Sequence, residues 1–222
     1  MRSDAAGLPE LPGTLPDALR EFARHASPRI LLALAVGSAV ARVAVGGLAA
    51  TDLVVALAVT ALWPLQEWLI HVGILHFTPL RVGRWTLDFL VPRMHRAHHR
   101  DPWRLELVFI PLPVYLGVPA ILALLLALAS PPPARVLTAL AVYFALALHY
   151  EWIHFLIHTR YPPRGARYRR LWRNHRLHHF KNERYWYGVT MLAGDRLLGT
   201  AADPERVPTS RTARRRARVS AA

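Results

Sequence analysis

The chain has 222 residues, of which 53% are hydrophobic, a formal net charge of +14 and no cysteine. The missing cysteines exclude disulfides, thiolate zinc sites and iron–sulfur clusters. A strongly basic chain commonly binds nucleic acid or anionic lipid headgroups. Because the hydrophobic residues are gathered into long blocks, the composition favours a single membrane domain facing anionic lipid and argues against nucleic acid.

The first 28 residues form a separate N-terminal segment without the apolar core of a cleavable signal peptide. Pro9, Pro12 and Pro16 disfavour a helix at its start. The stretch Pro16–Ala26 predicts a short amphipathic helix lying on the membrane surface, with simple disorder as the alternative.

Four stretches are long and apolar enough to cross a bilayer, whose core of roughly 30 Å needs about 20 helical residues. They are Ile30–Ala50, Leu53–Val72, Leu107–Ala129 and Val136–Ile157. A turn around Thr51 and Asp52 and the sequence SPPPAR are the short connections that predict two antiparallel hairpins. The third span contains three prolines that are expected to bend or break it.

The arginines predict the orientation of these spans. Six lie between the second and third spans and more follow the fourth, whereas the two short turns contain only Arg135. Both termini and the long loop are therefore expected to face the cytoplasm. Residues 201–222, which include RTARRRARV, are expected to form a basic, disordered tail against lipid.

Eleven of the twelve histidines lie between positions 71 and 179, at span ends or in the loops expected to face the cytoplasm. The twelfth, His25, is expected to be an ordinary surface residue. The eleven form four groups, namely His71 and His76; His95, His98 and His99; His149, His154 and His158; and His175, His178 and His179.

Helical spacing explains most of this pattern, because residues i+3 and i+4 lie within about 60° of residue i. The pentapeptides HRAHH (95–99) and HRLHH (175–179) can each present three imidazoles to one place, with the adjacent pair diverging toward two metals. His154 and His158 also share a face, whereas His149 lies on the opposite one and is left out as a ligand. His71 and His76 are about 140° apart on an ideal helix, which suits a helix end, a bulge or two different ions.

Ten candidate ligands are too many for a structural zinc site, which needs four, and they favour a dinuclear centre. Imidazole suits iron, zinc, copper and nickel. Metal-bound imidazoles usually donate their second N–H to a carboxylate or a carbonyl. Glu67 and Glu151 precede His71 and His154 on the same helix faces and are expected to serve in this way, with a salt bridge to a loop arginine as the alternative. The Glu-x-x-His spacing leaves direct ligation by Glu151 open as well.

The ordered motifs H-x4-H, H-x2-H-H, H-x3-H and H-x2-H-H resemble those of the fatty acid hydroxylase/sterol desaturase superfamily of integral-membrane di-iron oxygenases. The resemblance runs from about His71 to Thr200 and includes YGVTMLAGDRLLGT. It implies an all-α membrane domain at residues 29–200, with four spans in two hairpins and a cytoplasmic helical cap over a lipid-accessible cavity. The implied iron ligands are His71, His76, His95, His98, His99, His154, His158, His175, His178 and His179.

The chemistry implied by this resemblance is hydroxylation or desaturation of a lipid C–H position with O2 and two electrons. The substrate would be fatty acyl or sterol-like. Enrichment in arginine and alanine separately suggests a high-GC bacterial genome, so the expected setting is a bacterial cytoplasmic membrane. Because no cytochrome b5-like domain is fused here, electrons would come from a separate cytochrome b5-like protein, ferredoxin or reductase. Two iron ions are the expected cofactors, and zinc can replace them in a recombinant preparation.

Three other interpretations stay open. The last motif is also similar to that of bacterial carotenoid ring hydroxylases, where His149 could complete an H-x4-H with His154. A metal transporter or zinc-binding membrane protein is a second, although transport favours ionisable residues near the bilayer midplane and these histidines gather at span ends. A membrane scaffold with incidental histidines is the third, and it should purify without stoichiometric metal.

Overall fold

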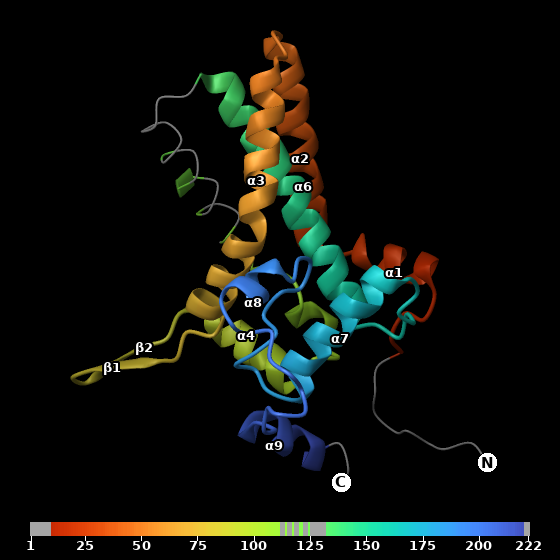
Figure 1. Ribbon diagram of the computed structural model, residues 1–222, viewed down its shortest axis with the longest axis vertical. Helices are drawn as coiled ribbons and strands as arrows, with labels where there is room; N and C mark the ends of the chain where they lie inside the picture. Colours follow the sequence, from red (N-terminus) through yellow and green to blue (C-terminus); the bar gives the residue numbers. More distant parts are fainter. Residues whose placement is uncertain are drawn as a thin grey trace.

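The computed structural model describes residues 10–111, 114, 117, 120, 121, 124 and 132–219, with side chains as far as Arg215. Three long helices run side by side, and the shorter elements gather at one end of them (Figure 1). The elements are α1 (Leu15–Phe22), α2 (Ala26–Val45), α3 (Ala50–Ile70), the π-helical turn η1 (His71–Leu75), β1 (Leu80–Val82), β2 (Trp85–Leu87), α4 (Leu90–Arg100), the 3-10 turn η2 (Leu105–Leu107), α6 (Pro133–Ile157), α7 (Ala166–Phe180), α8 (Ala193–Leu197) and α9 (Arg211–Val219).

Three helices of the described chain are long and apolar enough to cross a membrane: α2, α3 continued by η1, and α6. They correspond to the first, second and fourth predicted spans, although each begins three or four residues earlier than predicted. The third predicted span, Leu107–Ala129, lies mostly outside the described residues, and Leu107 itself ends a 3-10 turn. The arrangement of four spans in two hairpins therefore stays a prediction.

The turn between α2 and α3 lies at residues 46–49, so the predicted position at Thr51 and Asp52 is wrong. Gly46 and Gly47 have φ values of 74° and 61°, a left-handed region that glycine adopts without steric cost. The buried guanidinium of Arg42 donates to the Asp52 carboxylate at 2.7 and 2.8 Å and to the Gly46 carbonyl at 2.7 Å. Thr138 of α6 donates to the same carboxylate, so the cation inside the first span has a carboxylate partner and ties three helices together.

The core between the three long helices is formed by Leu31 of α2, Trp63 of α3 and Phe144 and Ala147 of α6. The outer faces of α2 and α3 expose leucine and valine side chains along their whole length. A continuous apolar surface of this size is typical of a protein that contacts lipid. Length, composition and exposure together indicate a membrane protein.

Helix α1 lies across the ends of α2 and α6 (Figure 1), where a short amphipathic helix was predicted. It ends at Phe22, four residues earlier than expected. The Thr14 side chain accepts a hydrogen bond from the Asp17 backbone N–H and begins the helix. The Phe22 ring packs edge-on against Trp152 at 5.0 Å between ring centroids, which attaches α1 to the end of α6.

Two sequence expectations are wrong outside the long helices. The chain is mostly but not entirely α-helical, because β1 and β2 form an antiparallel hairpin in which Leu80 pairs with Leu87 and Val82 with Trp85. The C-terminal segment was predicted to be disordered, but α9 forms there and the Ser210 backbone N–H donates to the Lys181 carbonyl at 2.9 Å. Buried Ala213 helps to explain the difference, because it gives α9 an apolar packing contact despite the arginines around it.

Candidate metal centre

All ten predicted ligands come together below the three long helices, in two groups of five. The first group is His71, His76, His95, His99 and His178, and the second is His98, His154, His158, His175 and His179. Within each group, one nitrogen from every ring lies within 4.8 Å of the others. Among the residues that the structure describes, neither group includes His149, Glu151 or His25.

Each pentapeptide divides its three histidines between the two groups. Helix α4 gives His95 and His99, four residues apart, to the first group and His98 to the second. Helix α7 gives His175 and His179 to the second group and His178 to the first. Neighbouring residues on a helix point about 100° apart, so each adjacent histidine pair is divided between the groups.

The spacing of His71 and His76 is explained by the π-helical turn η1. The His76 backbone N–H donates to the His71 carbonyl at 3.0 Å, which is the i to i+5 bond of a π-turn. This wider turn places both rings on one side, with centroids 5.2 Å apart and planes inclined by 25°. Of the three options that the spacing left open, the structure combines two, because the π-helical bulge lies at the end of the helix.

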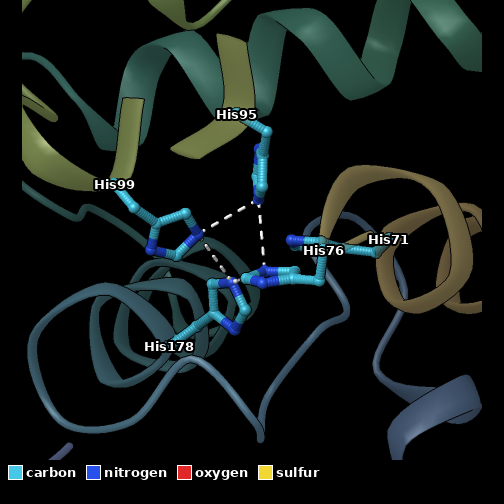
Figure 2. A group of neighbouring side chains, drawn as sticks. All are labelled: His71, His76, His95, His99 and His178. Carbon is cyan, nitrogen blue, oxygen red and sulfur yellow. Dashed lines mark hydrogen bonds between the residues drawn. The ribbon is translucent and has the colours of Figure 1, made fainter. Parts of the chain in front are cut away.

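Four rings of the first group point their Nε2 atoms at one another (Figure 2). Successive Nε2–Nε2 distances are 3.2 Å from His76 to His95, 3.0 Å from His95 to His99, 3.2 Å from His99 to His178 and 3.1 Å from His178 to His76. An Nε2 atom carries either a proton or a lone pair, so it cannot be donor to one neighbour and acceptor from the other. The centre of a planar square with such sides lies about 2.2 Å from each nitrogen, close to the length of a metal–imidazole bond.

The second group also contains imidazoles whose nitrogens approach one another closely, and it lies next to the first group. His158 and His175 approach to 3.0 Å between Nε2 atoms, and the His98 ring lies 4.5 Å from the His158 ring, nearly perpendicular to it. The rings of His99 and His179, one from each group, stack at 4.2 Å with planes 10° apart. The donors in the two groups therefore fit a pair of transition-metal ions at neighbouring sites.

Burial keeps these imidazoles neutral. It lowers the pKa of His76 to about 4, and it holds the pKa of six other clustered histidines well below the usual range, where neighbouring imidazoles add to the effect. These other histidines are His95, His99, His158, His175, His178 and His179. A neutral ring keeps a nitrogen lone pair available to a metal at neutral pH.

Two backbone carbonyls hold histidines of the first group. His71 Nδ1 lies 2.7 Å from the Tyr187 carbonyl oxygen, and His178 Nδ1 lies 2.8 Å from that of Tyr185. Because a carbonyl can only accept, both Nδ1 atoms must carry the proton, and Nε2 is left with its lone pair toward the group. Between the two carbonyls, Trp186 has a φ of 58°, a left-handed conformation that is uncommon for tryptophan and often found at functional sites.

Asp195 at the start of α8 braces this segment, and the sequence analysis did not single it out. Its fully buried carboxylate accepts the backbone N–H groups of Tyr187 and Gly188, both at 2.8 Å, and the Thr200 hydroxyl at 2.6 Å. The backbone donors that it binds leave no trace in a sequence. The available signal was a single acid, followed directly by Arg196, in the otherwise apolar stretch LAGDRLL.

The two glutamates expected behind the ligands are buried and have other hydrogen-bond partners. Glu67 accepts from the indole N–H of Trp63 at 3.1 Å, from the backbone N–H of Val189 and from both the N–H and the hydroxyl of Thr190. It therefore joins α3 to the segment that follows Tyr187, and it acts on His71 through that segment. Glu151 accepts the Ser27 hydroxyl and the Ile110 backbone N–H, which joins α6 to α2 and to the residues after η2.

A cavity of about 300 Å³ opens beside both groups. Its wall is mostly apolar and comes from α3, η1, α4, the residues after η2, and α6. His95 of the first group and His154 of the second both line it. An apolar space with a few polar groups at one end is the usual form of a site for a largely hydrocarbon ligand.

Known proteins are similar to this chain in sequence and in fold. A dihydroceramide fatty acyl 2-hydroxylase of Arabidopsis thaliana is 28% identical over 139 residues, which cover 62% of this chain and 56% of the relative. A fatty acid 2-hydroxylase of Macaca fascicularis is 30% identical over 136 residues, which cover 60% of this chain and 36% of the relative. The chain thus matches little more than half the length of one curated relative and about a third of the other.

A solved structure of full-length scs7p, in which only the hydroxylase domain is visible, superposes with a TM-score of 0.66. The superposition covers 83% of this chain and 68% of the other at 22% sequence identity, so it shows a common fold. The family model described as fatty acid hydroxylase matches residues 55–200, which include all ten clustered histidines and Asp195. The chain therefore belongs to the fatty acid hydroxylase family.

Proposed function

We propose that this chain is a membrane oxidoreductase that hydroxylates a C–H bond of a fatty acyl chain with O2. The observation that carries the proposal is the apolar cavity whose wall includes one histidine from each group, His95 and His154. A hydrocarbon chain in that cavity would approach both groups at once. Hydroxylation at the acyl 2-position is the first expectation, since both curated relatives are named as 2-hydroxylases.

Two iron ions are the proposed cofactors, one held by each group of five histidines. Iron in an all-imidazole site would supply the activation of O2, chemistry that protein side chains do not provide themselves. The facing Nε2 atoms of the first group and the carbonyl-held Nδ1 protons of His71 and His178 support this assignment. Zinc binds similar donors and is the ion most apt to replace iron in a recombinant preparation.

The protein's own part in the reaction is to bind, orient and desolvate the substrate. Ile70 and Ile74 of α3 and η1, Met94 of α4 and Ala147 of α6 line the cavity and would hold an extended chain by apolar contact. The same side chains would keep bulk water from the reacting carbon. The segment braced by Asp195 and Glu67 would keep the imidazoles fixed while substrates enter and leave.

Electrons are proposed to come from a separate carrier, a cytochrome b5-like protein, a ferredoxin or a reductase. We further propose that both termini and the histidine groups face the cytoplasm. The distribution of arginine supports this orientation, because the long loop and the C-terminal segment carry most of the positive charge.

Lipid mass spectrometry on an expression host tests the proposal directly. The host is supplied with iron and expresses either the wild type or His178→Ala, with His149→Gln as the control because His149 belongs to neither group. The expected result is a lipid that gains one oxygen with the wild type and with His149→Gln but not with His178→Ala. Fragmentation of that lipid places the oxygen and separates acyl, sterol-like and carotenoid substrates.

Other outcomes of this experiment would change the assignment. A lipid that loses two hydrogens would replace hydroxylation by desaturation. A protein that binds two metal ions per chain and changes no lipid, even with a reductase and electron carrier supplied, would contradict the oxygenase and favour a zinc-binding membrane protein. A protein without stoichiometric metal would favour a scaffold.

A further inference from the structure

The hairpin β1–β2 has one apolar face and one polar face. Side chains alternate along a strand, and the pairing of Leu80 with Leu87 and of Val82 with Trp85 puts these four residues on the same face. Arg81 and its partner Thr86 lie on the other face. The four apolar side chains are between 43% and 65% exposed, so no described part of the chain covers them.

This apolar face continues the lipid-facing surface of the long helices. Exposed apolar residues precede the hairpin, with Leu69 on α3 and Ile74 on η1, and follow it at Phe89 and Leu90. The hairpin leaves the body sideways near the lower end of α3, across the direction of the three long helices (Figure 1). It therefore extends outward at the level where the second predicted span ends.

The charges on the hairpin suit the boundary between lipid and water. Arg84 in the turn lies over the Trp85 ring, with its guanidinium carbon 5.2 Å from the ring centroid. Tryptophan favours the headgroup layer of a membrane, and arginine there meets anionic lipid phosphates.

We propose that the hairpin lies in the headgroup layer of an anionic bilayer, with Leu80, Val82, Trp85 and Leu87 against the acyl chains. The residues at its base line the cavity, since Leu75 precedes the hairpin and Val91 and Met94 follow it. In this position the hairpin fixes η1 and α4, two walls of the cavity, at the surface of the membrane. The cavity then faces the layer from which a lipid would enter.

The chain has no cysteine, so single cysteines can be placed and spin-labelled without background. The test uses four variants of the full, metal-loaded chain in nanodiscs of phosphatidylcholine and phosphatidylglycerol. Val82→Cys and Leu87→Cys report on the apolar face, and their neighbours Arg81→Cys and Thr86→Cys are matched controls on the polar face. Collision rates of each label with oxygen, which concentrates in lipid, and with a water-soluble nickel complex are measured by electron paramagnetic resonance.

The proposal predicts an alternating result along each strand. Labels at positions 82 and 87 should collide more with oxygen and less with nickel, and labels at 81 and 86 should show the reverse. Equal nickel collisions at all four positions would overturn the proposal, because the hairpin would then lie in water. Dipolar broadening between labels at position 87, lost on dilution with unlabelled chain, would assign the face to a second copy instead. Iron content, measured on the same samples, tests the proposed function separately.

Discussion

Replacing Asp195 by asparagine should weaken metal binding in the first group without touching a ligand. One carboxylate oxygen accepts the Tyr187 N–H and the other the Gly188 N–H. An asparagine side chain keeps one acceptor and turns the other into a donor, so either orientation leaves one buried backbone N–H unpaired. An unpaired buried donor costs about 1–3 kcal/mol, against a total stability of about 5–15 kcal/mol for a typical domain.

The expected loss of metal affinity follows from displacement of the backbone carbonyls that hold two of the histidine ligands. Tyr185 and Tyr187 orient His178 and His71, and loss of such a contact behind a ligand typically lowers metal affinity about 10–100-fold. Iron content and competition with a chelator measure the affinity, and thermal unfolding in detergent measures stability. The expected result for Asp195→Asn is a fall from two tightly bound irons per chain toward one.

Asp203→Asn is the matched control for this experiment. It makes the same chemical change eight residues later, where the carboxylate is exposed and accepts the Glu205 N–H at 3.1 Å. This variant should keep both irons and its stability. If Asp195→Asn lost stability but bound iron as tightly as Asp203→Asn, the proposed link from Asp195 to the ligands would be refuted.

Three further experiments test separate parts of the structure. His98→Ala and His99→Ala remove neighbouring ligands of different groups, so each should lower the iron content toward one per chain; full occupancy in either would contradict the grouping. Arg42→Met should lower the melting temperature in detergent, because the Asp52 carboxylate loses its cationic partner, and Asp52→Leu in the same chain should restore much of it. Gly194→Ala should cost about 1–3 kcal/mol, because its methyl group would meet the α3 backbone; Gly37→Ala, with open space around it, is the control and should melt at or above the wild-type temperature.

The clustering of the histidines could be predicted from the sequence because their spacing is a local property of helices. The i, i+3, i+4 pattern holds wherever residues 95–99 and 175–179 are helical, so the division of His98 from His99 and of His178 from His179 follows from helix geometry. The relative positions of His71 and His76 could not be predicted from spacing alone, because a π-turn is set by packing around a helix end and not only by the residues in it. Spacing could only include a bulge among the options.

The parts that sequence could not predict depend on contacts between distant segments. The carbonyls of Tyr185 and Tyr187 are backbone groups, and any residue type could provide them. Asp195 and Glu67 are recognisable only after α8 has packed on α3. The predicted helix ends differ from the observed ones because a charged residue in a sequence does not show where an ion pair such as Arg42–Asp52 will form. The hairpin was missed because three-residue strands carry too little alternation to be distinguished from a loop.

Each half of the chain provides one histidine to the group that is formed mainly by the other half, so each group of five needs both halves. The half that ends with α4 contains four donors of the first group and lacks the fifth, His178, while the half that begins with α6 contains four of the second and lacks His98. Neither half carries a full set, so a chain of which only the first half has been synthesised offers no complete set of five donors to a metal ion. Each complete set of five forms only when both halves dock. Iron that binds five donors would then favour the docked over the separated state, in the same way that a ligand stabilises the fold it recognises.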